Sequence, residues 1–298
     1  MKKSLGALIG LTAILLNLTL VRAGELKQFP EPGKDYIPGK DSGFEIYRTK
    51  SMLNTREVVL SFDDGPHVIN TPKTLDVLKK YNIKATFFVL TENINQKTMP
   101  IIKRIVEEGH VLASHHHDHQ NNNGKSEAQY RSELKRTVEM IAELNQKFGG
   151  TKEIYYRFPY GEYGSGKLEY HHFNVMKEVS NDLFRENCIN FAFWDIDSLD
   201  WLAPMNESDI VSNIMAHLEG GRAYNMKKGR FSGKYKKDGY DITRPYAGGV
   251  VLMHDIHEKS VNALEKLLPR LLSSGFKVVP ISIVQEFKYG DRACDLVN

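Results

Sequence analysis

Apolar and polar positions follow two alternating patterns along most of this chain. Short runs dense in β-branched residues, typical of buried strands, are separated by longer stretches with the apolar spacing of an amphipathic helix. The pattern predicts strands at 57–62, 84–90, 110–113, 154–158, 189–194, 249–253 and 276–280. It predicts helices at 71–81, 97–108, 173–187, 207–218 and 259–273, and a long helix that begins after Ser126. Such alternation predicts an α/β fold whose parallel sheet closes into a barrel or near-barrel.

Two of the predicted helices begin with specific signals. Thr71 followed by Pro72 is an N-cap and first-turn pattern, because proline lacks the amide proton that a first turn leaves unpaired. Ser126 with Gln129 is a capping box, in which each side chain bonds the backbone amide of the other residue. Both signals support the helix assignments that the periodicity gives.

The first residues form a segment of a different kind. Lys2 and Lys3 precede an apolar run at 5–20, which ends shortly before a small residue, Ala23. This is the pattern of a secretory signal peptide, so residues 1–23 are predicted to be removed on export to the periplasm or the medium. The alternative is an uncleaved membrane anchor, for which the apolar run is short.

Two regions are expected after the signal peptide. Residues 24–54 are rich in proline, glycine and charge, and they predict an irregular lead-in. Residues 55–290 are expected to form the single main domain, with an insertion at about 220–247.

The charge balance narrows the possible partners. The whole chain carries a formal charge of +3, and Lys2, Lys3 and Arg22 supply three positive charges, so the mature chain is neutral. Nucleic acid is therefore not expected as a partner. Because the signal peptide is predicted to be removed, no stable membrane span is expected in the mature protein either. The two cysteines, Cys188 and Cys294, either pair in an exported compartment or stay as buried thiols, and the sequence leaves both alternatives open.

An acid pair and a histidine pair carry the first chemical signal. Asp63 and Asp64 come directly after an apolar strand, where neighbouring side chains point in opposite directions. The pair therefore favours two roles, with Asp64 as a metal ligand and Asp63 as a base that acts on water. His115 and His119 are four residues apart, a spacing that places two imidazoles on one side of a helical turn. Together they predict a single-metal hydrolase, and a solvated polar loop is the alternative for the histidine run.

Two further candidates follow predicted strands. Arg157 is a fixed cation that is expected to keep Asp63 ionised and oriented, and a loop salt bridge is the alternative. His254 titrates near neutrality and suits protonation of a leaving amine, although a lone histidine after a strand is often structural. Because the carboxyl ends of parallel barrel strands share one face, both residues are expected to meet Asp63 and His115 there.

Five short segments, in this order, resemble the motifs of the polysaccharide deacetylases of the NodB-homology type, carbohydrate esterase family 4. They are Ser61–Pro66, His115–His119, Arg157–Tyr160, Asp197–Trp201 and Leu252–Asp255. The resemblance covers roughly residues 55–287, and five ordered motifs are specific in a way that no single motif is. It implies an α/β fold that is a distorted, incomplete (β/α) barrel of the NodB-homology type.

The resemblance also implies a reaction and a site. The reaction is hydrolysis of an N-acetyl group on a glucosamine polymer, assisted by one divalent metal that is usually Zn2+ and in some members another transition metal. The implied catalytic residues are Asp63 as base, His254 as acid, Arg157 as tether of the base and Asp200 as the group that orients the acid. The implied metal ligands are Asp64, His115 and His119. The implied substrate-binding residues are Tyr160, through its backbone amide, and Trp201 and Leu252, around the acetyl group.

The chain departs from the family motifs at two positions. His116 stands where the family usually has a serine or threonine, which leaves open a shifted set of ligands that involves His116 or His117. Phe158 stands where a second proline is common, and this matters less because Arg157 and Pro159 are retained.

The insertion at about 220–247 has little periodicity. From Arg222 to Arg244 it contains eight lysines or arginines and two acids, with tyrosines and a phenylalanine between them. One interpretation is a surface that stacks on sugar rings and attracts carboxylates of a peptidoglycan glycan or its peptides. The alternative is an ordinary solvated loop.

The sequence as a whole predicts an exported, metal-dependent polysaccharide N-deacetylase. Peptidoglycan is the expected N-acetylglucosamine-containing substrate, because a signal peptide of bacterial type brings the enzyme to the cell wall. Two alternatives remain: an O-acetyl esterase of the xylan type, and a non-catalytic glycan-binding relative.

Overall fold

The computed structural model describes residues 49–163, 172–228, 235–288 and 294–297, together with the short antiparallel strands β1 (Ile37–Pro38) and β2 (Glu45–Ile46). The predicted signal peptide, residues 1–23, and most of the predicted lead-in lie outside these residues. In the described part of the chain, no helix has both the length and the apolar character that crossing a membrane requires.

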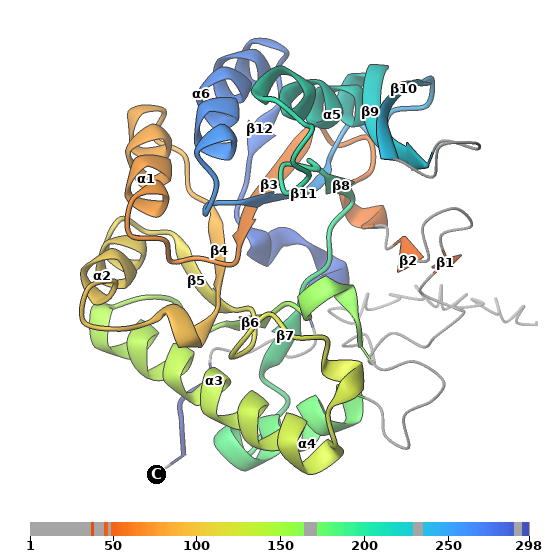
Figure 1. The fold of residues 1–298 in the computed structure, drawn as a ribbon. Coiled ribbons are helices and arrows are strands. Elements are labelled where there is room, and N and C mark those ends of the chain that lie inside the picture. The colour runs from red at the N-terminus through yellow and green to blue at the C-terminus, as the bar shows by residue number, and fades with distance from the viewer. Residues whose placement is uncertain are drawn as a thin grey trace, which may run out of the picture.

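A parallel sheet forms the centre of the fold (Figure 1). Its strands, in spatial order, are β7 (Ile189–Phe191), β6 (Ile154–Tyr156), β5 (Val111–Ser114), β4 (Thr86–Val89), β3 (Glu57–Asp63), β11 (Gly249–His254) and β8 (Ile196–Asp197). A further short strand, β12 (Lys277–Val278), pairs with the start of β3. Every strand pair in this sheet is parallel, as the alternation of strands and helices predicted.

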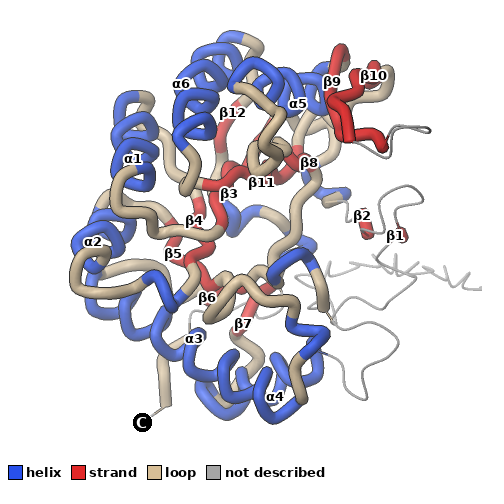
Figure 2. Tube along the Cα trace, viewed as in Figure 1, coloured by secondary structure: helices blue, strands red, loops and turns tan. Residues whose placement is uncertain are grey.

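Helices surround the arc of strands on its outer side (Figure 2). They are α1 (Asn70–Lys80), α2 (Met99–Glu107), α3 (Glu127–Phe148), α4 (His172–Phe184), α5 (Glu207–Glu219) and α6 (Glu258–Ser273). Short 3-10 turns lie at Lys50–Met52, Thr91–Asn93, Asn122–Gly124, Pro159–Gly161, Ile281–Ile283 and Gln285–Phe287.

The two faces of β3 have different surroundings. Val58, Leu60 and Phe62 belong to the apolar core that includes buried residues of the flanking helices. Val59 belongs to a separate apolar cluster, and Asp63 shares its side of the strand, because side chains two residues apart point the same way. The strand period therefore directs Asp63 away from the helix layer.

The sheet does not close. Its end strands, β7 and β8, do not pair, and the segment between them crosses the gap. At one side Ala192 N donates to Tyr156 O (2.9 Å), and at the other Asp195 N donates to Val250 O (2.9 Å). We call residues 192–195 the seam segment. This arrangement confirms the predicted distorted, incomplete barrel.

The structure corrects two strand ends. The strands predicted at 154–158 and 189–194 end at Tyr156 and Phe191, because the chain leaves the sheet there to form the site and the seam segment. The apolar residues beyond these ends are buried without belonging to a strand.

The two helix signals have different outcomes. The Ser126 side chain accepts from Gln129 N (3.3 Å), as predicted, but the Gln129 amide group donates to Glu133 instead of completing the capping box. The Thr71 hydroxyl accepts from His67 N (2.8 Å) and also bonds Asp255, and α1 begins one residue earlier than predicted.

The insertion contains two strands that the sequence did not indicate. β9 (Gly221–Lys228) and β10 (Tyr235–Ile242) pair in antiparallel fashion and pack beside α5 (Figure 1). The strands carry charged residues on both faces, so the alternation that marks a half-buried strand is missing. We call this pair the β9–β10 ribbon.

The two cysteines form a disulfide bond. Cys188, immediately before β7, pairs with Cys294, and their Cα atoms are 6.1 Å apart. Val297 N also donates to Leu183 O (2.9 Å) at the end of α4. The described C-terminal residues are thus fixed to the β7 end of the molecule.

Candidate active site

The carboxyl ends of five strands bring the candidate residues together. Asp63 ends β3 and His254 ends β11, whereas His115 and Arg157 directly follow β5 and β6. Asp200 lies three residues beyond β8. Because all these strands are parallel, residues that are far apart in sequence meet at one edge of the sheet.

A left-handed backbone at Asp64 lets both adjacent acids face this edge. The strand ends at Asp63, and Asp64 has a φ of 72°, which turns its side chain back toward the site. His115 Nε2 lies 3.4 Å from Asp64 Oδ1 and 3.7 Å from Asp63 Oδ2. Asn93 Nδ2 donates to Asp64 O (2.9 Å) and holds the turn. The two acids are thus neighbours in the site without being parallel members of one strand.

Asp64, His115 and His119 form a cluster that is suited to a metal ion. Their candidate ligand atoms all lie within 4.8 Å of one another. His119 Nε2 is 3.5 Å from Asp64 Oδ1, and that oxygen is buried and accepts no hydrogen bond from the described residues. A buried carboxylate oxygen without a donor fits a cation at this position.

The tautomer of His115 supports the same assignment. His115 Nδ1 lies 2.9 Å from Arg157 O, and a carbonyl can only accept, so Nδ1 carries the proton. Nε2 then presents its lone pair toward Asp64. Burial lowers the pKa of His115 well below its usual value, which keeps the ring neutral. One carboxylate and neutral imidazoles are ligands that Zn2+ and similar transition metals prefer.

The two extra histidines point to other partners. His116 Nε2 lies 3.0 Å from Glu133 Oε2, and its Nδ1 lies 3.0 Å from the Tyr156 hydroxyl. His117 Nδ1 lies 3.0 Å from Thr91 Oγ1. The shifted set of ligands that the sequence left open is therefore not the arrangement that the structure brings together.

A second group of potential ligands already contains a cation. His116, Asp118 and Glu133 are close enough to hold a metal, but the Lys125 ammonium lies 2.9 Å from Asp118 and 2.6 Å from Glu133. Lys125 is buried. We call His115–His119 the histidine loop. Through Glu133, this group of polar side chains connects the loop to α3.

Arg157 is fully buried and binds Asp63 directly. One guanidinium nitrogen donates to Asp63 Oδ1 (2.7 Å) and Ser61 Oγ (2.9 Å), and the others donate to the carbonyls of Ala192 (3.2 Å) and Phe193 (3.0 Å). Burial raises the pKa of Asp63 to about 6, and the Arg157 charge opposes that rise. The arginine thus joins the seam segment to the acid.

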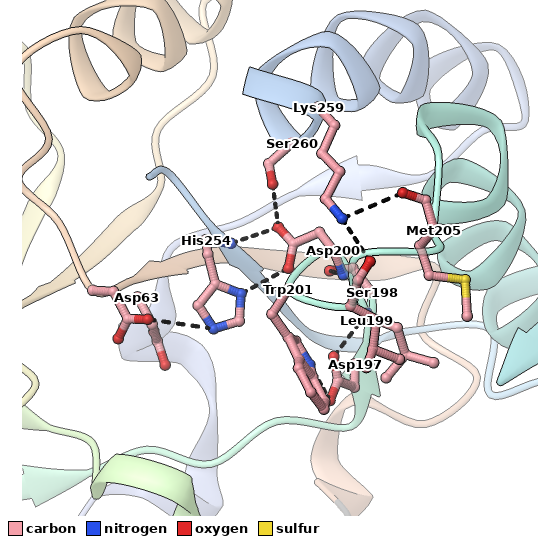
Figure 3. A network of polar contacts seen from close by, with 12 residues as sticks. Asp63, Asp197, Ser198, Leu199, Asp200, Trp201, Met205, His254, Lys259 and Ser260 are labelled. Atoms are coloured by element: carbon pink, nitrogen blue, oxygen red, sulfur yellow. Dashed lines mark hydrogen bonds and ion pairs between the residues drawn. The ribbon is translucent and has the colours of Figure 1, made fainter. Parts of the chain in front are cut away.

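His254 and Asp200 form the second charged pair (Figure 3). His254 Nδ1 lies 2.7 Å from Asp200 Oδ1, while Asp200 Oδ2 accepts from His254 N (2.7 Å) and Ser260 Oγ (2.7 Å). Burial alone would lower the pKa of His254, but the Asp200 carboxylate raises it to about 10. His254 Nε2 faces Asp64 Oδ2 at 3.9 Å.

The remaining predicted residues surround this centre. Trp201 and Tyr160 are each 47% exposed, and the Tyr160 ring packs against His119 with their centroids 4.3 Å apart. The indole nitrogen of Trp201 donates to Asp197 Oδ2 (3.5 Å). Leu252 is buried on β11, directly opposite Asp197 on β8. Two aromatic rings are therefore exposed beside the polar centre.

Sequence reasoning missed Ser61 and Ser260. Ser61 is two residues before Asp63, so the strand period could have placed it on the same side. Ser260 lies in the first turn of α6, shortly after His254, and its hydroxyl donates to Asp200 on the loop after β8, which is far away in sequence. Local sequence carries no signal for that second contact.

The chain matches a known family and known relatives. The family model described as polysaccharide deacetylase matches residues 50–176. A peptidoglycan-N-acetylglucosamine deacetylase of Bacillus cereus is 31% identical over 239 residues, which cover 79% of this chain and 70% of that protein. The peptidoglycan-N-acetylglucosamine deacetylase PgdA of Listeria monocytogenes is 28% identical over 263 residues, 87% of this chain and 44% of that protein. The solved structure of the Bc1960 peptidoglycan N-acetylglucosamine deacetylase is 30% identical, with a TM-score of 0.56 and coverage of 78% and 90%.

Proposed function

The chain belongs to the polysaccharide deacetylase family, and on that premise we propose that it is an exported, metal-dependent N-deacetylase of the N-acetylglucosamine units of peptidoglycan. The peptidoglycan deacetylases of this family hydrolyse the amide bond of N-acetyl groups. The choice of peptidoglycan is supported by relatives from Bacillus and Listeria whose names state that substrate. The observation that carries the mechanism is one cluster of metal-binding type with the Asp63–Arg157 pair and the Asp200–His254 pair beside it.

Asp64, His115 and His119 would hold the metal, which we propose is Zn2+. A divalent metal at such a site supplies a Lewis acid for the acetyl carbonyl and lowers the pKa of water. The three side chains offer one carboxylate oxygen and two imidazole nitrogens, a set of ligands that Zn2+ prefers.

Asp63 acts as the base that takes a proton from the attacking water. Arg157 holds one of its oxygens at 2.7 Å and leaves Oδ2 on the side of His115. The fixed cation keeps the carboxylate oriented, and a base with a pKa near 6 accepts a proton more readily than an ordinary aspartate.

His254 acts as the acid. With a pKa raised to about 10, its imidazole is protonated at neutral pH, and Asp200 holds the Nδ1 proton so that Nε2–H faces the site. Water adds to the acetyl carbon, the carbon–nitrogen bond breaks, and the nitrogen takes the His254 proton to leave as the free amine of glucosamine with acetate as the other product. The backbone amide of Tyr160 donates to the developing oxyanion, and Trp201 and Leu252 enclose the acetyl group.

Export is the second part of the proposal. The signal pattern at residues 1–23 and the Cys188–Cys294 disulfide support it, because disulfides persist in oxidising compartments outside the cytoplasm. The test is the mass of the protein recovered from the periplasm or medium, which is expected to begin at Gly24.

Acetate release tests the activity. Purified protein with measured metal content is incubated with peptidoglycan, N-acetylglucosamine oligomers and acetylated xylan. Acetate from peptidoglycan, with about one metal per chain, is the expected result. Acetate from xylan alone would show an O-acetyl esterase, and no acetate from any substrate by the metal-loaded protein would show a non-catalytic glycan-binding protein.

A further inference from the structure

The β9–β10 ribbon is directed toward the active site by its contacts with α5. Ser212 Oγ donates to Arg222 O (2.9 Å), and Asn213 Oδ1 accepts from Tyr224 N (2.7 Å). Further along the ribbon, Lys237 Nζ lies 2.8 Å from the Asp209 carboxylate. Lys237 is opposite Met226, so β9 runs from Tyr224 beside Asn213 to Met226 near Asp209, in the direction opposite to α5.

This direction places the outer end of the described ribbon on the site side of the molecule. The N-terminal end of α5 follows the loop that carries Asp200, so β9 runs back toward that loop. At the outer end Lys228 is opposite Tyr235, whose side chain is exposed. Figure 1 shows the two strands beside α5.

A buried asparagine joins the ribbon to the site loop. Asn213 Nδ2 donates to Ser198 O (3.2 Å), while its Oδ1 accepts from Tyr224 N on β9. Ser198 lies between Asp197 and Asp200 in the loop after β8. The position of the ribbon is therefore fixed relative to the residues that orient His254.

The strand register identifies which face of the ribbon is turned to the site. Lys236 is opposite Lys227, and Tyr240 is opposite Ala223. Residues opposite each other, and residues two apart, share one face of a ribbon. Tyr240 is 38% exposed, and Ala223 opposite it is fully buried. On the other face, Lys237 lies over the Tyr224 ring and pairs with Asp209 of α5, so the face with Tyr240 is turned away from α5. The charge of Asp197 on β8 contributes to the rise in the pKa of Tyr240, after burial and Tyr246, which agrees with this face lying toward β8. We call this face, which carries Lys227, Lys236, Asp238 and Tyr240, the inner ribbon face.

The inner ribbon face has positive charge that the described residues do not neutralise. Lys227 and Lys236 are directly opposite each other, an arrangement that costs free energy because like charges repel. Asp238 lies 3.7 Å from Lys227, but no described carboxylate pairs with Lys236. Lys237, by contrast, points to the other face and is paired with Asp209. An anion bound between Lys227 and Lys236 would remove this repulsion.

We propose that the inner ribbon face is a second binding surface for the same polymer, on which Lys227 and Lys236 bind carboxylates carried by the glycan next to the sugar in the active site. This proposal rests on the proposed function, and it specifies the substrate class as a carboxylate-bearing glycan in preference to a neutral N-acetylglucosamine polymer. The lysines act on binding and take no part in the chemical step.

The test compares the variant Lys227→Gln/Lys236→Gln with the wild type on two substrates. Removing two exposed charges is expected to raise KM for peptidoglycan fragments about threefold to tenfold and to leave kcat unchanged. KM for neutral N-acetylglucosamine oligomers should not change. Added salt should weaken the binding of wild-type protein to peptidoglycan more than that of the variant.

The matched control removes two exposed lysines elsewhere. Lys135 on α3 and Lys177 on α4 lie toward the other end of the sheet, and Lys135→Gln/Lys177→Gln makes the same change in net charge. This variant should behave as wild type on both substrates. An equal rise in KM for both double variants, or no rise for the ribbon variant, would overturn the proposal.

Co-sedimentation with insoluble peptidoglycan separates this proposal from the proposed function, because it needs no turnover. Less of the ribbon variant than of the wild type should co-sediment with native peptidoglycan and with peptidoglycan stripped of phosphate polymers. The two proteins should co-sediment equally once the carboxyl groups of the peptidoglycan have been amidated. If the difference in co-sedimentation between wild type and ribbon variant disappeared on phosphate-free peptidoglycan, the surface would bind phosphate, and the proposal of carboxylate binding would be wrong. Lysine-dependent binding without acetate release would refute only the activity, whereas acetate release without lysine dependence would refute only the ribbon.

Discussion

At Asp63 and Asp64, one backbone angle directs two adjacent and identical side chains to different neighbours. Asp63 is buried against Arg157, whereas Asp64, after a left-handed turn, faces His115 and His119. The sequence indicated two roles because adjacent strand residues diverge. The structure adds that the strand ends between them, so both acids reach the same site.

Asp63→Asn tests this division. The amide cannot take a proton from water, so acetate release should fall by at least about 100-fold, while the metal content stays near that of the wild type because Asp64, His115 and His119 are unchanged. Metal analysis and acetate assays on the same preparation measure both. Loss of the metal in this variant would show that the two aspartate roles are assigned wrongly.

Glu133 on α3 is expected to stabilise the histidine loop through its contacts with His116 and Lys125. Its carboxylate contacts His116 and Lys125, and the His116 hydrogen bond lowers the pKa of Glu133. Glu133→Gln should lower the free energy of unfolding by about 1 to 3 kcal/mol and weaken metal binding by roughly tenfold. Glu143→Gln, at an exposed position of the same helix, is the control for urea unfolding and metal titration. Identical behaviour of the two variants would mean that the loop needs no such support.

His110, which lies outside the candidate active site, makes the free energy of unfolding depend on pH. Burial lowers the pKa of His110 to about 4, with Lys84 and Arg104 adding to the shift and Glu108 opposing it. Its Nδ1 accepts from Ala85 N (3.1 Å) and cannot hold a proton there. The unfolded chain therefore binds a proton between pH 6.5 and 4 that the folded chain does not, so stability falls as pH falls through this window.

The variant His110→Asn isolates that effect, since its side-chain oxygen can still accept from Ala85 N. Between pH 7 and pH 5 the wild type should lose about 2 kcal/mol more stability than the variant. Urea unfolding of both proteins at the two pH values measures the difference. Parallel losses would show that His110 is not the group responsible.

At the scale of elements, prediction succeeded where burial imposes a period. The strands β3, β4, β5 and β11 and the helices α2 and α6 lie close to their predicted ranges, because each has a buried face with a clear repeat. The β9–β10 ribbon escaped prediction because both of its faces carry charge. Its strands pack on α5, the helix that directly precedes them, and the bond between Asn213 and Tyr224 leaves no periodic mark in the sequence.

Asn213 is the residue through which α5 orders both the ribbon and the site loop. Asn213→Ala leaves Ser198 O and Tyr224 N without their partner, which should cost about 2 to 4 kcal/mol in unfolding free energy. Ser212→Ala, which removes an exposed bond to Arg222 O, should cost well under about 1 kcal/mol. Hydrogen exchange at the Tyr224 amide should become faster only in the Asn213 variant, and unchanged exchange would contradict the assigned link.

At the scale of the whole molecule, the disulfide closes a long loop. Cys188 and Cys294 are 106 residues apart in sequence, so the bond restricts the unfolded chain strongly. The variant Cys188→Ala/Cys294→Ala should be less stable by about 3 to 5 kcal/mol, and guanidinium unfolding with and without reductant measures this. Acetate release at low temperature should persist, because the bond lies beside β7 and away from the candidate ligands. Reductant that leaves wild-type stability unaltered would contradict the prediction.

The sequence indicated the candidate catalytic residues and metal ligands better than the residues that support them. Asp63, Asp64, His115, His119, Arg157 and His254 stand in short local patterns, and the end of a strand predicts where each of them lies. Ser260, Glu133 and Asn213 act through contacts between distant elements, so no local spacing marks them. The pairing of Cys188 with Cys294 was likewise undecided until the β7 end of the sheet and the C-terminal residues were placed together.

The contacts of Arg157 limit which mutations such an enzyme can accept during evolution. One guanidinium donates to the carbonyls of Ala192 and Phe193 in the seam segment and also to the carboxylate of Asp63, the proposed base. A mutation that tightens or loosens the seam segment must therefore shift the base, and one that retunes the base must disturb the seam. Variants selected for heat resistance and variants selected for faster turnover should rarely carry their changes in residues 192–195, and both should accumulate them elsewhere.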